Sequence, residues 1–503
     1  MISVISPRLL EDNLSIPRFP AEVLDPQARK ALAIKALART QPLTRLADQN
    51  QVSRKFLYQQ AAKADNALDA AFSRSTPDDK VLFEYQVTAA RLRQVILSLL
   101  LNTHGSYQGV QHWLRDVWDR EISLGTIHNI VAGVVDQARK INHQEDLSRI
   151  RIGAQDEIFQ GDPVLVGIDP NSTYCYLLAQ EPSRDATTWG YHLLELVQRG
   201  FNPDYTVADF GTGLRAGQAE AMPGVPCWGD VFHAEREVGM MVRYLENRAL
   251  GTISHRDKLQ RKMDRAKHRQ QGQPLSKKLA LSRQEEAQAV SLADDLQLLW
   301  QWMKELLALV GPPLAERREL YDFLVSELRA REDRAPHRIR PVRIALENRR
   351  EALFTFVERI AQGITQIAKK HQVSPQAVRA LYELGAIPVE VPGRWQREDE
   401  LRKQLGAAHF PVRQDLAEFL EHDIVRASSL VENLNSRLRT YFFLRRELGK
   451  DYLELLRFFL NHRPYLRSRK EARVGKSPAE LLAGNPQPHW LEQLGFTRFR
   501  RAA

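Results

Sequence analysis

Cysteine is almost absent from this chain. Only Cys175 and Cys227 occur among its 503 residues. Two cysteines cannot build a disulfide framework or a cysteine-rich zinc site, and such a composition is typical of a reducing compartment. We therefore expect a cytoplasmic protein.

Long apolar runs are missing as well. The longest, "VILSLLL" at 95–101, is far shorter than the roughly 18 residues that a membrane-spanning helix needs. The N-terminal stretch "MISVISPRLLEDNL" lacks the basic region followed by an apolar core that marks a signal peptide. The sequence accordingly predicts neither a membrane span nor a secretory signal.

The residues that are present indicate a folded chain with a basic balance. Hydrophobic residues make up 43% and charged residues 27% of the sequence, which is typical of globular proteins. A chain of this length predicts roughly two to four domains. The net charge of +10 favours a polyanionic partner.

The N-terminal part reads as helical, with two segments that have the rhythm of a helix-turn-helix. In the first, at 42–64, Ser53 is expected to cap a second helix that turns Arg54, Lys55 and Tyr58 outward. In such a motif the second helix can enter the major groove of DNA. Arg54, Lys55 and Tyr58 are therefore the first candidate DNA-binding residues.

The second such segment lies at 106–140. One helix face is predicted from Val110, Trp113, Leu114 and Val117. Ser123 is expected to cap the next helix, whose inward positions are Ile127, Ile130, Val131 and Val134 and whose candidate DNA-binding residues are Thr126, His128 and Asn129. The alternative for either segment is a helical bundle that contains a tight turn; two in tandem on a basic chain favour DNA binding.

From residue 149 the hydrophobic period changes from helical to alternating. Three strands, a helix, a strand, a helix and a last strand are predicted up to about residue 234, which is the element order of the ribonuclease-H-like fold. A highly charged helical stretch follows, and then a final helical block with a basic tail. The predicted fold class is multidomain α+β.

Several acids lie on or beside the predicted strands. Asp156 is in phase with the apolar residues of the first strand, whereas Glu157 points to the opposite face. Asp209 ends the strand "YTVAD", where ligands of open α/β sheets gather. Asp169 lies in "DPNS", where capping of a turn explains a carboxylate; it is the fallback if the strand register is shifted.

A third carboxylate, Glu432, lies on a predicted helix at 427–449. Its spacing to Asn435 and Arg439 places all three on one polar stripe, opposite a face formed by Leu430, Val431, Leu434, Leu438, Tyr441 and Phe442. Two carboxylates on neighbouring strands and one from a packed helix are suited to a pair of Mg²⁺ ions. An adjacent Asn and Arg would position and neutralise a phosphate. From spacing alone, the alternative is that Asp156, Asp209 and Glu432 are structural residues that do not form one site.

The ordered motifs resemble those of bacterial DDE-type insertion-sequence transposases. "AQDEIFQGDPVLVGIDPNSTYCYLLAQEPSR" is similar to their first catalytic strand and hairpin, and "YTVADFGTG" to the segment of the second Asp. "GDVFHAERE" is similar to an Asp-x-x-His signature, "VENLNSRLRTYFFLRRELG" to the helix with the catalytic Glu, and "GKSPAELLAG" to the end of such enzymes.

The resemblance implies a site and a partner. It assigns Asp156, Asp209 and Glu432 as catalytic metal ligands for two Mg²⁺ ions, with Mn²⁺ as a substitute, and places Asp230, His233, Asn435 and Arg439 beside them. The partner is double-stranded DNA at transposon terminal inverted repeats and at the target, cleaved and joined by a homodimer or higher oligomer. The implied regions are helix-turn-helix regions 1–75 and 76–148, core 149–237, helical insertion 238–425 and the end of the core 426–503.

Several alternatives stay open. Glu235 or Glu237 would supply the third ligand without an insertion, although neither has the Asn and Arg stripe. Trp300 and Trp302 are expected in the core of the insertion, with stacking on a flipped base as the alternative. The chain is alternatively a catalytically inactive DNA-binding regulator, or a ribonuclease-H-like nuclease without strand transfer.

Overall fold

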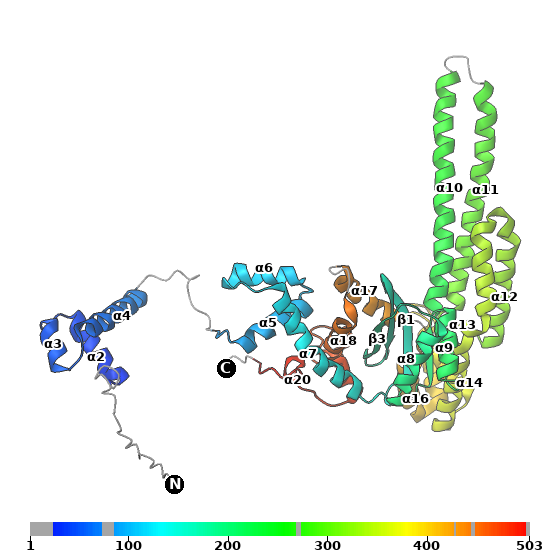
Figure 1. Cartoon of the computed structure of the whole chain (residues 1–503). Helices are drawn as coiled ribbons and strands as arrows, with labels where there is room; N and C mark the ends of the chain where they lie inside the picture. Colours follow the sequence, from blue (N-terminus) through cyan, green and yellow to red (C-terminus); the bar gives the residue numbers. More distant parts are fainter. Residues whose placement is uncertain (1–23, 73–84, 268–272, 427–428, 444–447, 499–503) are drawn as a thin grey trace, which may run out of the picture. The chain divides into compact units, whose positions relative to one another are not determined.

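The computed structural model describes residues 24–72, 85–267, 273–426, 429–443 and 448–498. The chain divides into two compact units, 1–86 and 87–503, and Figure 1 shows the elements of both. The predicted boundary at 75/76 lies outside the described residues, as do the last five residues of the basic tail. The boundaries predicted at 148/149, 237/238 and 425/426 stay predictions.

The N-terminal unit is built from three helices, α2 (Pro26–Leu37), α3 (Leu43–Gln49) and α4 (Arg54–Phe72). Leu32, Leu46 and Leu57 are buried at its centre. The Ser53 hydroxyl accepts a hydrogen bond from the Phe56 amide at 3.0 Å, so the predicted cap of α4 is confirmed. The α3–turn–α4 segment has the predicted helix pair.

The second unit begins with α5 (Ala89–Asn102), α6 (Tyr107–Trp118) and α7 (Leu124–Gln144). Ser123 caps α7 by accepting from the Thr126 amide, as predicted. The apolar stripes are confirmed except at Val117, which is 56% exposed. It lies in the last turn of α6, where the helix ends and the side chain faces solvent.

A five-stranded mixed sheet forms the centre of this unit. Its strands are β1 (Ile152–Gln160), β2 (Asp162–Ile168), β3 (Cys175–Gln180), β4 (Tyr205–Ala208) and β5 (Cys227–Gly229). They lie in the order β3-β2-β1-β4-β5. β1, β2 and β3 pair antiparallel, whereas β1, β4 and β5 pair parallel. The predicted element order and the mixed sheet are confirmed, consistent with a ribonuclease-H-like core.

Helices cover both faces of the sheet. α8 (Ala186–Gln198) and α9 (Thr212–Ala221) share a core with one face of β2 and β3. α17 (Ser429–Phe443) and α18 (Gly449–His462) pack on the other face, together with residues of α5, α6 and α7. The predicted apolar face of α17 is buried, apart from Leu430, whose side chain lies outside the described residues. Helix α19 (Pro478–Ala483), capped by Ser477, and α20 (Trp490–Gln493) follow.

Between β5 and α17 the chain is all-α, as predicted. The helices are α10 (Val231–Lys267), α11 (Gln273–Leu306), α12 (Leu314–Arg331), α13 (Pro336–His371), α14 (Pro375–Leu384), α15 (Arg394–Leu405) and α16 (His409–His422). α10 and α11 lie side by side and extend beyond the end of α12 (Figure 1). Among the described residues, no helix combines the length and apolar character needed to cross a bilayer.

Candidate metal centre

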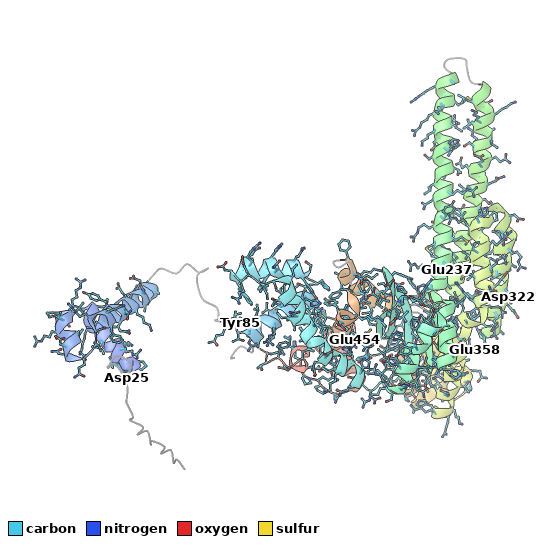
Figure 2. The ribbon with its side chains drawn as sticks, in the orientation of Figure 1. Asp25, Tyr85, Glu237, Asp322, Glu358 and Glu454 are labelled. Carbon is cyan, nitrogen blue, oxygen red and sulfur yellow. The ribbon has the colours of Figure 1, made fainter. Side chains whose placement is uncertain are left out.

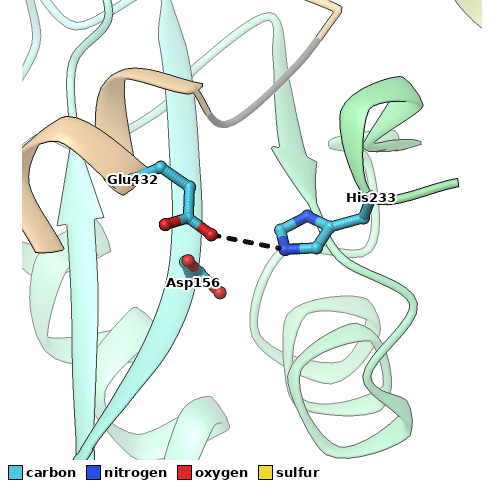
Figure 3. Close-up of side chains that lie close together, drawn as sticks. All are labelled: Asp156, His233 and Glu432. Carbon is cyan, nitrogen blue, oxygen red and sulfur yellow. Dashed lines mark ion pairs between the residues drawn. The ribbon is translucent and has the colours of Figure 1, made fainter. Parts of the chain in front are cut away.

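Three side chains from three distant parts of the second unit converge at one point. Asp156 comes from β1, His233 from the first turn of α10, and Glu432 from the first turn of α17. One oxygen of each carboxylate and one imidazole nitrogen all lie within 4.8 Å of one another, and Figure 3 shows the three groups facing a common space. Two oxygen donors and an imidazole are suited to a divalent cation.

The register of the parallel strands brings the acids together. Gln155 of β1 pairs with Ala208, the last residue of β4, and Ala208 pairs with Gly229, the last residue of β5. The residues that directly follow Gln155, Ala208 and Gly229 are Asp156, Asp209 and Asp230. The three acids therefore follow one another across neighbouring strands at the carboxyl ends of β4 and β5, the edge where ligands of α/β sheets bind.

Asp156 is buried, with 6% of its surface exposed. Its Oδ1 accepts from the Glu157 amide and its Oδ2 from Asn435 Nδ2, both at 2.8 Å. Burial raises the pKa of Asp156 to about 6, and the negative charges of Asp209 and Glu432 act in the same direction. The Glu157 amide and the positive charge of His233 oppose this rise. Burial beside other acids disfavours the ionised form of Asp156, and a bound cation would favour it.

Asn435 supports the fit to a cation. The residue is 1% exposed, and its Oδ1 has no hydrogen-bond partner within the described part of the chain. A buried amide oxygen without a partner costs free energy. Together with Asp156 and Glu432 it gives this site a set of hard oxygen donors that suits a metal ion.

His233 is held by Asp230. The completely buried Asp230 accepts from the His233 amide at 3.2 Å and pairs with His233 Nδ1 at 2.9 Å. This hydrogen bond raises the pKa of His233 to about 9. The imidazole is therefore protonated at neutral pH, with Nε2 3.8 Å from Glu432 Oε1, and must lose its Nε2 proton before it can bind a metal.

Glu432 is surrounded by cations. Besides His233, Arg236 Nη1 lies 3.5 Å from Oε1, and Arg439 Nη2 lies 3.8 Å from Oε2. Glu432, Asn435 and Arg439 thus face the same site, as their spacing predicts. Arg236 was not predicted; its position three residues after His233 on a helix is the signal that could have found it.

Asp209 lies next to the three converging residues but is not one of them. Its Oδ1 accepts from the Gly211 amide at 2.9 Å, which turns the carboxylate toward the loop after β4. Its charge nevertheless acts on both Asp156 and His233. The structure therefore brings Asp156 and Glu432 together with His233 and leaves Asp209 beside them.

The alternative acids are engaged elsewhere. Asp169 accepts from the Asn171 and Ser172 amides at 3.2 and 2.9 Å, so the predicted turn capping is confirmed. Glu237, labelled in Figure 2, pairs with Arg349 at 2.6 Å. Burial raises the pKa of Glu235, and the positive charges of Arg426 and Lys304 oppose this.

The two tryptophans of the insertion differ. Trp300 is half-buried against the helical core, with Lys304 Nζ 4.1 Å from its ring centroid. Trp302 is 41% exposed, so its predicted core position is wrong. Its ring lies 6.5 Å from that of Phe323, and the two line a surface pocket between α11 and α12.

The six candidate DNA-binding residues lie on the outer faces of their helices. Arg54, Lys55 and Tyr58 are exposed in the first turns of α4. Thr126, His128 and Asn129 are exposed near the start of α7, where Thr126 Oγ1 also shares a hydrogen bond with Ser123 Oγ. The six side chains are thus accessible near the starts of α4 and α7, and their binding to DNA stays a prediction.

No family model matches the chain, and no curated protein does.

Proposed function

We propose that this chain catalyses metal-dependent cleavage and joining of DNA, as a transposase that acts on the ends of its own element. The observation that carries the proposal is the convergence of Asp156 and Glu432 at the edge of a ribonuclease-H-like sheet, with Asp209 directly after the neighbouring strand β4. Two or three carboxylates at such an edge are the ligand set for Mg²⁺ in phosphoryl transfer.

Each residue has a defined part in this proposal. Asp156, Glu432 and Asp209 would hold two Mg²⁺ ions, or Mn²⁺ in their place. When bound, these ions supply positive charge at the attacking and leaving oxygens of a phosphodiester.

The neighbouring side chains would act on the ligands and on the phosphate. Asn435 fixes the carboxylate of Asp156 through its 2.8 Å hydrogen bond, and Asp230 fixes the ring of His233. Arg236 and Arg439, now within ion-pair distance of Glu432, would turn to the phosphate and neutralise it. No protein residue is needed as a covalent nucleophile, since water and then a DNA 3′-hydroxyl fill this role.

The two helix-turn-helix segments would select the DNA. Exposed basic and polar side chains at the start of α4 and α7 suit contacts with phosphates and base edges. Replacing Arg54 and Lys55 by Ala should weaken binding to the element's end. The plot of log affinity against log salt concentration should also become less steep, by the amount expected for the loss of about two phosphate contacts. Metal affinity should be unchanged, because both residues belong to the other compact unit.

The direct test is incubation with a duplex that carries the DNA flanking the gene, with and without Mg²⁺. The proposal predicts metal-dependent nicking followed by joining to a second duplex, abolished by Asp156→Asn and by Glu432→Gln. Cleavage without joining would indicate a nuclease, and binding without cleavage would indicate a regulator. Full cleavage by either variant would show that the metal ligands are wrongly assigned.

A further inference from the structure

One face of α10 carries a line of cations from the candidate metal centre to the far end of the helix. On a helix of 3.6 residues per turn, a sector of about 100° contains His233 and six basic residues. These are Arg236, Arg243, Lys258, Arg261, Lys262 and Arg265. No acidic residue falls in this sector between His233 and Arg265. Glu235, Glu246, Asp257 and Asp264 lie together on another side, and Glu237, just outside the sector, pairs with Arg349.

The first members of this line face the candidate metal centre. His233 and Arg236 both lie within ion-pair distance of Glu432. At the start of α10 the basic sector therefore faces the candidate metal centre. The opposite side of the distal helix packs against α11, with Ala249 and Met263 buried. The basic face therefore looks outward, and Figure 2 shows side chains projecting along the whole length of this helix pair.

Among the described residues, the cations at the far end of α10 have no ion-pair partner. Lys258, Arg261, Lys262 and Arg265 are exposed. Within the described part of the chain they form no ion pair, unlike Arg256, which pairs with Asp257 and Glu286. Their spacing of three and four residues places like charges on successive turns, which destabilises an isolated helix.

On α13, by contrast, several basic residues are paired with acids. Arg350 pairs with Asp322, and Arg343 pairs with Glu347. The surface of α13 thus carries both signs of charge. The uncompensated face of α10 is different, and an external polyanion would remove its self-repulsion.

We infer that this face of α10 binds the backbone of double-stranded DNA that continues outward from the candidate metal centre. The inference rests on the proposed function, because it takes the DNA at that centre as the substrate. From His233 to Lys258 the helix spans 258 − 233 = 25 residues, or about 38 Å at about 1.5 Å per residue. Arg265, 32 residues away, lies at about 48 Å, so the cations meet the duplex about 11 to 14 base pairs from the reacting phosphate.

The side chains of this basic face favour binding of double-stranded DNA independently of its sequence. Lysine and arginine at the tip match phosphates, whereas the aromatic side chain of this sector, Tyr244, is stacked under Arg338 at 3.9 Å. A flexible single strand is held mainly by stacking on aromatic rings. A straight line of cations fits a stiff duplex better.

The test is the affinity of the full chain for a duplex of random sequence, measured by fluorescence anisotropy in the presence of a chelator. The variant Arg261→Ala/Arg265→Ala is compared with Arg397→Ala/Arg402→Ala. The control also removes two positive charges, but from exposed positions of α15. All four positions are exposed on helices, and a thermal scan checks that both variants remain folded.

For a duplex of about 25 base pairs, the α10 variant should lose about tenfold in affinity. Its plot of log affinity against log salt should become shallower by about 1.8, the value for two phosphate contacts. The control should bind like the parent chain. The gain in affinity on lengthening the duplex from about 10 to about 25 base pairs should shrink in the α10 variant alone, because only a longer duplex reaches both ends of α10.

Three results would overturn the inference: equal losses in the two variants, single-stranded DNA bound as tightly as the duplex, or no binding by the parent chain at low salt. The chelator separates this test from the proposed chemistry. A chain that binds as expected but never cleaves with Mg²⁺ refutes the proposed function alone. A chain that cleaves but ignores the α10 substitutions refutes the inference alone.

Discussion

Two neighbouring acids on opposite faces of β1, Glu157 and Asp156, have different electrostatic surroundings. Glu157 faces the start of α8, where Arg184 of the preceding loop pairs with it and Trp189 Nε1 of the helix donates to it at 2.9 Å. Asp156 faces α17, where burial raises its pKa, the charges of Asp209 and Glu432 add to this, and a buried oxygen of Asn435 lacks a partner among the described residues. Glu157 thus has an arginine as its ion-pair partner, whereas the described residues give Asp156 none. Burial of an acid therefore indicates little until its partners are known.

Removing each acid should affect metal-dependent DNA cleavage very differently. Asp156→Asn should lower the rate by about a thousandfold, because it removes charge from the ligand set. Glu157→Gln keeps that set and should change the rate by no more than about threefold, within the range of changes remote from the chemistry. Single-turnover cleavage at saturating Mg²⁺ measures both. Equal losses would mean that the two faces do not differ in function.

The same pair should show opposite effects on stability without metal. The pKa of Asp156 in the folded chain, about 6, lies above the ordinary value of 3.8 for an aspartate. The unfolded chain therefore loses this proton first, and the cost of ionising Asp156 in the fold grows from pH 3.8 and is complete above pH 6. Asp156→Asn should stabilise the chain at pH 8 by about 3 kcal/mol, the free energy that corresponds to a pKa raised from 3.8 to about 6, and by little at pH 3.8.

Glu157→Gln should instead destabilise the chain at pH 8 by about 1–2 kcal/mol, since Arg184 and Trp189 lose a charged acceptor. Denaturant unfolding in a chelator, followed at both pH values, measures the two differences. A stabilising Glu157→Gln, or an Asp156→Asn effect that is the same at both pH values, contradicts the electrostatic account of β1.

The imidazole opposite Asp156 should titrate far from its ordinary range. Its hydrogen bond to Asp230 raises the pKa of His233 to about 9. The stability that this bond contributes is complete below pH 6.5 and is lost as the pH rises through 9. An NMR titration of the metal-free chain should find this value in the parent, and Asp230→Asn should bring it back toward 6.5. A parent value near 6.5 would mean that Asp230 does not hold the ring as described.

The smallest expected effect is on metal affinity and comes from a buried asparagine, Asn435. A second buried asparagine, Asn461, provides the control for a general loss of packing. Asn435→Ala should weaken metal affinity by about 10- to 100-fold, because the carboxylate of Asp156 loses the group that orients it. Asn461, completely buried on α18, hydrogen-bonds the backbone of Cys175. Asn461→Ala should lower stability and leave metal affinity as it is. Calorimetric titration of both variants decides whether Asn435 acts on the site or only on the fold.

The sequence predicted those features that depend on local patterns. Period-two alternation assigned Asp156 and Glu157 to opposite faces, short polar side chains before helices identified the caps at Ser53 and Ser123, and the turn sequence explained Asp169. The order of strands and helices followed from the changes of period. These features depend on residues a few positions apart, which a single sequence displays.

Features that depend on distant partners were missed. Val117 and Trp302 fit apolar stripes, yet whether a stripe is covered depends on where the neighbouring element ends. His233 was predicted beside the carboxylates, but its position within 4.8 Å of both Asp156 and Glu432 depends on the direction in which α10 leaves β5. The hydrogen bond from the Gly211 amide to Asp209 was not predicted either, and metal binding by Asp209 stays a prediction. Arg236 reached Glu432 across 196 residues of sequence.

The binding of a divalent cation by Asp156 and Glu432 is the central claim, and Mn²⁺ titration followed by electron paramagnetic resonance tests it most directly. The parent chain and Glu157→Gln should show the same saturable binding, and Asp156→Asn and Glu432→Gln should each lose it. Undiminished binding by Asp156→Asn, or a loss in Glu157→Gln as large as that in Asp156→Asn, would contradict the claim.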